Sequence, residues 1–458
     1  MKQNQSLRTF AQRIVLLAVG VSILSLAKSQ TTPLSLKEAL QYALKNKSDA
    51  IKARLDEENG QNKIDEAKSQ ALPQVNGNGS LTYNPILQLT ALPGDLAGQP
   101  GKTLLIPMGQ KWNSGASVSL SQTLFDKSVF TGLKAAKTTK QYYQLLAGLT
   151  DEQVIEKVAT QYYQVLVQRQ QLVNVDSNIA TTTRVKDVIE GQYKNGLAKK
   201  IDLDRSKVNL SNLQAQRQQL INAVQQQENT LKFYMGMPIE TPIAIPSVEL
   251  TDIQPGLSLI DNVADVTKLS DYKVLKKQEE LLQLQKQSIR AGDYPSLSFS
   301  GNYGYQGLGN SFPIGKSTGS GVNWFDYASV GLNLKIPLFN GFATRSKVRQ
   351  AEIDIRKLKE DIKNTELSLS LSNQNAKTQL RNSIITLNNQ KENVALAEEV
   401  YANTQNNYRQ GLAPLTDLLD AENSLSTAQN NYTAALLDYR LAEIQLIKAQ
   451  GNLKSLLN

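Results

Sequence analysis

An internal duplication constrains the fold of this chain more than any other feature of its sequence. The segment Tyr-Lys-Asn-Gly-Leu-Ala that begins at Tyr193 recurs at Tyr408 as Tyr-Arg-Gln-Gly-Leu-Ala, which sets the offset at 408 − 193 = 215 residues. Shorter matches follow the same order at similar offsets: Leu124-Phe125-Asp126 with Leu338-Phe339-Asn340, and Pro73 with Pro295. Matches that keep their order and spacing indicate two copies of one structural unit. We therefore expect one fold repeated twice, in residues 30–255 and 256–458.

Each copy shows the pattern helix, strand, loop, strand, very long helix, tight turn, helix. In the first copy we expect helices over about 33–71, 127–192 and 201–235. In the second copy we expect them over about 257–291, 341–409 and 414–453. Proline and glycine interrupt the chain after residue 235, which predicts an irregular linker up to about residue 255.

The long helices carry apolar residues at alternating spacings of three and four. The two clearest rows are Ile155, Val158, Tyr162, Val165 and Leu172, and Val348, Ala351, Ile355, Leu358 and Ile362. Such rows are typical of coiled coils, and the other positions are mostly polar. A helix of about 65 residues is roughly 100 Å long, and the two shorter helices of a copy match that length end to end. The sequence therefore predicts the wall of a helical tube.

Four segments alternate with period two, which predicts strands over 73–83, 113–125, 295–305 and 327–338. In the last of these, Val330, Leu332 and Leu334 alternate with Ser329, Gly331 and Asn333. Alternation alone fits a soluble half-buried sheet equally well. The small polar side chains on one face and the long loops 84–111 and 306–326 favour strands of a transmembrane barrel with a watery interior.

Four strands are too few to close a barrel, since about eight is the smallest number that does so. An open sheet edge in a membrane leaves backbone groups without hydrogen bonds, so several chains must share one barrel. Two chains give 8 strands, which their own side chains fill, whereas three give 12 strands and an aqueous pore. We expect a mainly α chain: a long α-helical coiled-coil barrel, with a 12-stranded transmembrane β-barrel to which each chain gives four strands.

Residues 1–29 have the features of a secretory signal peptide. Lys2, Arg8 and Arg13 precede an apolar run over residues 14–27, and small residues follow it. This run is shorter than the roughly 20 residues that span a bilayer, so cleavage and export are expected. An uncleaved anchor or a buried helix is the alternative.

Composition excludes several classes of function. The chain contains no histidine and no cysteine, which excludes histidine-based triads, His/Cys zinc sites and disulfides. Its basic residues are scattered among acidic ones, so a nucleic-acid interface is not expected. The glycine-rich segment 307–321 leads to no helix, which argues against a phosphate-binding loop. We expect no enzyme activity, no cofactor and no metal site.

The duplicated turn Tyr-x-x-Gly-Leu-Ala-x-x-x-Asp-Leu, with the pattern around it, resembles that of the TolC-like outer-membrane factors over nearly the whole mature chain. The resemblance implies a homotrimer in the outer membrane whose helical barrel extends into the periplasm. It also implies a periplasmic adaptor protein and an inner-membrane transporter as partners. The function implied is the passive exit duct of a tripartite efflux pump or type I secretion system. A structural coiled-coil protein of the periplasm or surface, without transport activity, is the alternative.

The resemblance also assigns roles to the two turns. It implies that the tips dock the adaptor, through Gly196, Leu197, Ala198, Gly411, Leu412 and Ala413. Helix capping is the alternative, because glycine after a helix commonly adopts the left-handed conformation and the leucines would then cover the cap.

The second turn matches the periplasmic gate of this family. The resemblance implies that Asp417 and Asp420 form acidic rings and that Tyr408 helps to hold the gate closed. Ala413 stands where the best-studied member has a latch arginine, so the latch is weaker here or is built differently. The alternative is that both aspartates complement the positive end of the helix that follows Pro414. Asp202, in the first copy, is interpreted as a cap.

Overall fold

The computed structural model describes residues 34–93, 95, 98, 101–246, 260 and 265–457. The expected signal peptide, the expected helix start at residue 33 and residues 247–255 of the expected linker lie outside these residues. The chain forms two compact units. Unit 1 comprises Met1–Ile51, Asp151–Ala264 and Ser372–Asn458, and unit 2 comprises Lys52–Thr150 and Asp265–Leu371. Each unit therefore takes segments from both sequence copies.

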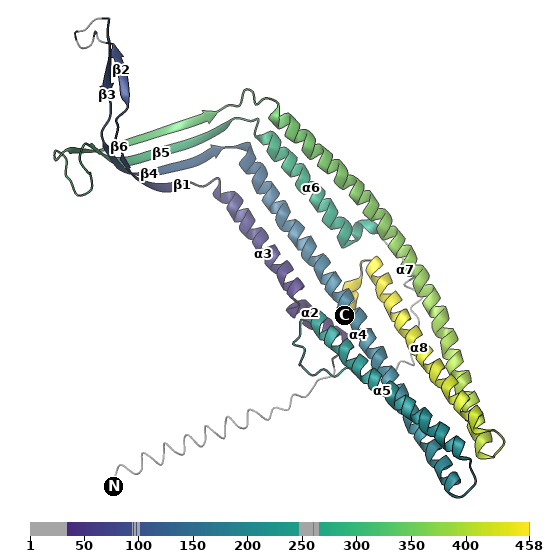
Figure 1. Cartoon of the computed structure of the whole chain (residues 1–458). Coiled ribbons are helices and arrows are strands. Elements are labelled where there is room, and N and C mark those ends of the chain that lie inside the picture. The colour runs from purple at the N-terminus through teal and green to yellow at the C-terminus, as the bar shows by residue number, and fades with distance from the viewer. Residues whose placement is uncertain are drawn as a thin grey trace, which may run out of the picture. The chain divides into compact units, whose positions relative to one another are not determined.

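Unit 2 contains a four-stranded antiparallel sheet in the order β1-β4-β5-β6 (Figure 1). Its strands are β1 (Gln74–Tyr83), β4 (Trp112–Phe125), β5 (Ser296–Gly309) and β6 (Val322–Lys335). The middle pair, β4 and β5, joins the first sequence copy to the second. The two hairpins thus form one sheet, of which β1 and β6 are the outer strands.

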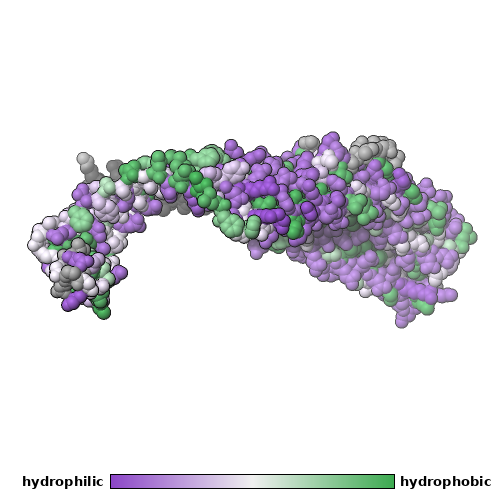
Figure 2. Space-filling model, turned by 90° about the horizontal axis from the view of Figure 1, so that it is seen from above, coloured by the Kyte–Doolittle hydropathy of each residue, from purple (hydrophilic) through white to green (hydrophobic). Residues whose placement is uncertain are grey.

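The register keeps apolar side chains on one face of this sheet. Val118, Tyr303 and Ala328 are partners in one row across β4, β5 and β6, and Leu120, Gly301 and Val330 form the next matching row. Many of these side chains are exposed in the single chain, Val330 at 76%. Figure 2 shows apolar side chains gathered over the sheet.

The loops of the sheet contain more structure than the sequence predicted. Within the expected loop 84–111, β2 (Leu89–Pro93) and β3 (Thr103–Pro107) form a separate two-stranded hairpin. Both strands are short and end in proline, which weakens a strand pattern. The pairing of β5 with β6 also continues up to Gly309 and Val322, into the expected loop 306–326.

The helices of unit 2 pack in the same order as its strands. They are α6 (Ser270–Ala291), with a 3-10 turn η4 (Val266–Lys268) before it, and the parts of α3 (Ser48–Ser69), α4 (Lys127–Lys194) and α7 (Ala343–Arg409) that fall within residues 52–150 and 265–371. Gly60 of α3 packs against α4, Thr138 of α4 bonds Glu280 of α6 at 3.4 Å, and Lys286 of α6 pairs with Glu352 of α7 at 2.9 Å. Among the described helices, none is both long and apolar enough to cross a bilayer.

Unit 1 contains α2 (Leu36–Asn46), α5 (Lys200–Met235), α8 (Leu415–Ala449), η5 (Leu453–Leu457) and parts of α3, α4 and α7. One apolar cluster joins α2, α4, α5 and α8, with Leu40, Ile155 and Leu231 fully buried. A second cluster lies between α7 and α8 around Leu380 and Leu436. Four residues of the predicted row on α4 are buried, as the coiled-coil interpretation requires: Ile155, Val158, Tyr162 and Val165.

The first helix differs from the expected continuous helix over 33–71, because it breaks at Lys47. That residue is extended (ψ 129°), and its ammonium donates to the Phe233 carbonyl at 3.0 Å and lies over the Phe233 ring. Gly236, at the end of α5, packs so closely that a Cβ there would lie 2.6 Å from the Asn46 carbonyl oxygen. The break is therefore caused by contact with α5, which the local sequence does not encode.

Candidate gate and docking site

The two helix–turn–helix tips have the same backbone geometry. Gly196 follows α4 with φ +72° and Gly411 follows α7 with φ +75°. The Leu197 N–H donates to the Gln192 carbonyl, and the Leu412 N–H donates to the Asn407 carbonyl, both at 2.8 Å. This is the hydrogen bond of a Schellman cap, in which glycine accepts the left-handed conformation without strain. Both glycines are therefore capping residues.

The tip leucines do not cover these caps. Leu197 is 80% exposed and Leu412 is 74% exposed. Ala198 packs against the apolar cluster at the tip, and Ala413 is half-buried. Each turn thus presents a large apolar side chain in the single chain, next to a capped and well-defined backbone.

Helix ends from both sequence copies meet at one apolar cluster, here called the tip cluster. Its buried members are Ile189, Leu203, Leu415 and Leu418. Val185, Ala198, Tyr401, Tyr408 and Leu419 pack around them. Residues of α4, α5, α7 and α8 are therefore held together at the level of the predicted gate.

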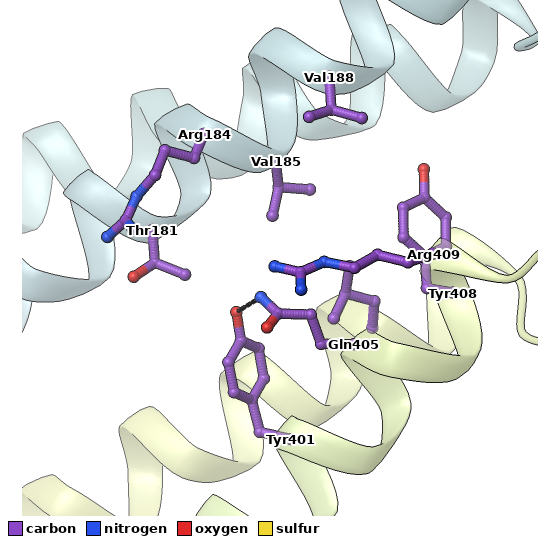
Figure 3. Close-up of a pocket in the computed structure, with 9 residues that line it drawn as sticks. Thr181, Arg184, Val185, Val188, Tyr401, Gln405, Tyr408 and Arg409 are labelled. Carbon is purple, nitrogen blue, oxygen red and sulfur yellow. Dashed lines mark hydrogen bonds between the residues drawn. The ribbon is translucent and has the colours of Figure 1, made fainter.

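A pocket of about 310 Å³ lies beside the tip cluster, between α4 and the end of α7 (Figure 3). Its walls are Thr181, Arg184, Val185, Val188, Tyr401, Gln405, Tyr408, Arg409 and Leu418. Gln405 donates to the Tyr401 hydroxyl at 3.0 Å. Figure 3 shows the Arg409 guanidinium reaching toward the centre of the pocket, with Arg184 near Thr181 at the other end. The pocket combines an apolar floor with two exposed cations.

Tyr408 is partly buried and belongs to this assembly. Burial raises the pKa of its phenol, and the carboxylate of Asp202 on α5 raises it further. The hydroxyl therefore stays protonated and can donate a hydrogen bond at physiological pH. Ala413 offers neither a charge nor a side-chain hydrogen bond to a neighbouring tyrosine.

Asp417 and Asp420 both lie on the exposed side of α8, near its start. Asp417 accepts a hydrogen bond from the Thr416 hydroxyl at 3.4 Å. Within the described part of the chain neither carboxylate forms an ion pair, and Pro414 provides no side-chain cap to α8. Because they are three residues apart, the two carboxylates lie on one side of the helix. They are thus available to a ligand or to a second copy of the chain.

The sequence did not single out several residues that the structure brings to this region. Arg184, Arg409 and Tyr401 line the pocket, and Thr182 bonds the buried carboxylate of Glu422. The sequence contained one indication that Glu422 is buried: it lies four residues after Leu418 and therefore on the apolar side of α8. Across residues 34–93, 101–246 and 265–457, no cluster of three Asp or Glu side chains is placed to hold a metal ion.

Comparison with known proteins points to one family. The sequence model of the family described as outer membrane efflux protein matches residues 39–237 and 273–452. These two matches fall in the two predicted copies, which confirms the duplication.

Individual relatives agree with this match. The outer membrane protein TolC of Escherichia coli is 23% identical over 457 residues, which cover 96% of this chain and 87% of that protein. TolC of Vibrio cholerae is 23% identical over 350 residues, which cover 74% of this chain and 76% of that protein. The crystal structure of the CmeC outer membrane channel of Campylobacter jejuni aligns with a TM-score of 0.71 at 15% identity, covering 93% of this chain and 90% of that chain. None of these relatives supports a purely structural coiled-coil protein.

Proposed function

The chain belongs to the outer membrane efflux protein family and is a subunit of an outer-membrane efflux channel; from this premise we propose that three copies form the exit duct of a tripartite efflux pump, gated and docked at the tips of unit 1. The family confirms the resemblance that the duplicated turn indicated. It also confirms the outer membrane as the location and a helical barrel in the periplasm. The trimer, the gate residues and the docking residues of this chain are the proposal.

The open edges of the four-stranded sheet are the main support for a trimer. β1 and β6 are the outer strands of the four-stranded sheet, so each has one edge of backbone groups that needs a partner in hydrocarbon. Pairing β6 of one copy with β1 of the next satisfies both edges. Three copies supply 12 strands, enough for a water-filled interior, and the polar face of the sheet then lines it.

Asp417 and Asp420 support a gate at the start of α8. Threefold symmetry would bring six exposed carboxylates around the axis, where they attract cations and resist the passage of anions. Tyr408, held protonated beside the tip cluster, supplies a hydrogen-bond donor near this entrance. Because Ala413 cannot form an ion pair, the tip is held closed mainly by apolar packing around Leu418.

The exposed leucines support docking of the periplasmic adaptor. Leu197 and Leu412 protrude from two turns of equal geometry, so one kind of helical hairpin on a partner would find two equivalent sites on each chain. The duct itself performs no chemistry, and an inner-membrane transporter supplies the energy.

Cation block of single channels tests this function. We expect the purified mature protein to conduct in planar bilayers and to be blocked by multivalent cations from the tip side. Asp417→Asn with Asp420→Asn should weaken the block at least about tenfold, since each carboxylate near a cation contributes on the order of 1 kcal/mol or more.

Asp438→Asn is the matched control, because Asp438 is an exposed carboxylate further along α8. It should leave the block unchanged. Equal block in the wild type and the double variant would remove these aspartates from the gate. A folded protein without any conductance would contradict the channel itself.

A further inference from the structure

A layer of polar contacts joins α4 to α8 between the tip cluster and the apolar clusters farther along unit 1. We call it the polar seam, and it consists of Asn174, Asn178 and Thr182 of α4 with Thr433, Ser426 and Glu422 of α8. The amide of Asn178 donates to the Ser426 hydroxyl at 3.0 Å, and the amide of Asn174 donates to the Thr433 hydroxyl at 3.5 Å. The three α4 residues are spaced by four and therefore share one face.

Polar contacts make this part of the α4–α8 contact different from its ends. On either side of the seam the contact includes apolar side chains such as Ile189 with Leu418, and Ile155 with Ile444. Separating apolar surfaces exposes them to water, whereas hydroxyl and amide groups exchange one hydrogen bond for another with water. Separating α4 from α8 therefore costs less free energy at the polar seam than at the apolar contacts on either side of it.

Glu422 is the exception within the seam, because it is a buried acid. It is 6% exposed, and Thr182, which is fully buried, donates a hydrogen bond to one of its oxygens. The second carboxylate oxygen is buried and has no hydrogen-bond partner among the described residues. Burying an ionised carboxylate with one oxygen unsatisfied is costly, whereas the neutral acid avoids most of that cost.

The protonation of Glu422 follows from these surroundings. Burial raises the pKa of Glu422, and the hydrogen bond from Thr182 opposes that rise. Burial raises the pKa of the phenol of Tyr401 on α7, and the charge of the Glu422 carboxylate raises it further. Arg184 of α4 and Arg409 of α7 also act on Tyr401 and lower its pKa. Tyr401 is thus the titratable group on α7 that interacts with Glu422, and the two arginines act on Tyr401.

The position of Glu422 connects the seam to the gate. It lies one helical turn beyond Leu418, which is 1% exposed in the tip cluster. Asp417 and Asp420 lie on the same first turns of α8. Because a helix moves as a rigid element over such a distance, any separation of Glu422 from Thr182 also moves the two aspartates.

We propose that Glu422 is a positioning residue for the gate: its neutral acid holds α8 against α4 in the closed tip, and its ionised form favours separation of the two helices at the polar seam. This inference rests on the proposed gate at Asp417 and Asp420. It assigns to a buried residue, rather than to the exposed acids, the pH dependence of opening.

The sign of the pH effect follows from proton linkage. In the separated state water surrounds Glu422 and its pKa is the ordinary one, whereas in the packed state the pKa is raised. The packed state therefore binds the proton more tightly. The stabilisation that the proton gives to the packed state is fully present below the ordinary glutamate pKa and is lost as the pH rises through the raised pKa. Closed tips should be favoured in acid, with open probability changing by up to about tenfold per pH unit for each Glu422 that titrates.

Single-channel recordings across a pH series test the proposal. The open probability of the wild type should rise with pH. Glu422→Gln keeps the shape and the hydrogen bond from Thr182 without the charge, so its open probability should stay low and independent of pH. Thr182→Val removes a bond to the ionised form and should move the transition to higher pH.

Two controls separate this effect from other acids. Glu399→Gln changes an exposed carboxylate of α7 and should keep the wild-type profile. Asp417→Asn with Asp420→Asn should weaken cation block and still keep the pH transition. A wild-type profile in Glu422→Gln, or a flat profile in Glu399→Gln, would overturn the proposal.

A measurement without conductance distinguishes this proposal from the proposed function. Infrared titration of the trimer should show a protonated carboxylic acid band that Glu422→Gln removes, and the thermal midpoint of the wild type should fall relative to that variant as pH rises. Absence of both changes contradicts the role of Glu422, even in a conducting protein. Their presence in a protein that never conducts contradicts the channel instead.

Discussion

Three glycines near helix ends adopt the same left-handed conformation but lie in different surroundings. Gly196 and Gly411 have open space where a Cβ would lie, whereas a Cβ on Gly236 would meet the backbone of Asn46. Side chains in the left-handed region cost about 1–2 kcal/mol through backbone strain alone. A tip glycine therefore tolerates alanine better than Gly236 does.

This difference gives a prediction at the residue scale. Gly196→Ala should reduce the local free energy of opening of the first turn by about 1–2 kcal/mol. Gly236→Ala should cost about 1–3 kcal/mol more, because α5 or Asn46 must shift. Gly191→Ala is the matched control within α4, where the residue is helical and has free space, and it should stabilise the same tip by about 0.5–1 kcal/mol. Amide hydrogen exchange measures each value, and equal losses for Gly196→Ala and Gly236→Ala would contradict the argument.

Residues of the candidate site differ in how far the sequence could predict them. The capping glycines could be predicted from the sequence, because a left-handed cap favours glycine next to the end of a periodic helix. The exposure of Leu197 and Leu412 could not be predicted, since the burial of these side chains depends on how the turns pack. The bond from Thr182 to Glu422 joins residues 240 positions apart, so only the packing of α4 on α8 reveals it.

At the scale of elements, the long periodic segments were the most predictable. The helix expected over 127–192 corresponds to α4, Lys127–Lys194, and the helix expected over 341–409 corresponds to α7, Ala343–Arg409. A long apolar row determines such helices locally. The break at Lys47 and the β2–β3 hairpin depend instead on tertiary contacts or on strands of five residues, for which local patterns carry little information.

The proposed docking by the two turns can be tested at the scale of elements. Leu197→Ser with Leu412→Ser should leave the fold intact, because both side chains are exposed and the backbone caps remain. We expect trimers of normal thermal stability that no longer support efflux in cells lacking their own channel. Loss of two exposed apolar contacts per chain should weaken adaptor binding by about tenfold or more.

Leu396→Ser is the control for that experiment, since Leu396 is 61% exposed on α7 and lies away from both turns. It should retain efflux. Normal efflux in the turn variant, or an equal loss in the control, would show that these leucines are not the docking residues.

At the scale of the whole molecule, the open sheet is the reason for proposing that several chains complete one barrel. The sheet of one chain has four strands, with β1 and β6 on the outside. Both outer strands need partners, and the faces of the sheet separate apolar from polar side chains along each strand. Single substitutions on the two faces can therefore test which face meets lipid in the proposed trimer.

Val330 and Ser329 are neighbours on β6, and their side chains lie on opposite faces of the sheet. Val330→Arg would place a charge among apolar side chains that we assign to the lipid face, at a cost of about 2–4 kcal/mol near the membrane midplane. Three copies multiply this cost in one barrel, so the variant should yield little membrane-inserted trimer. Ser329→Arg should insert normally and change the conductance, because its charge enters the water-filled interior. Extraction of each variant from outer membranes, followed by single-channel recording, measures both effects. Normal insertion of Val330→Arg together with failure of Ser329→Arg would mean that the faces are reversed, and normal insertion of both would mean that this sheet is not in the membrane.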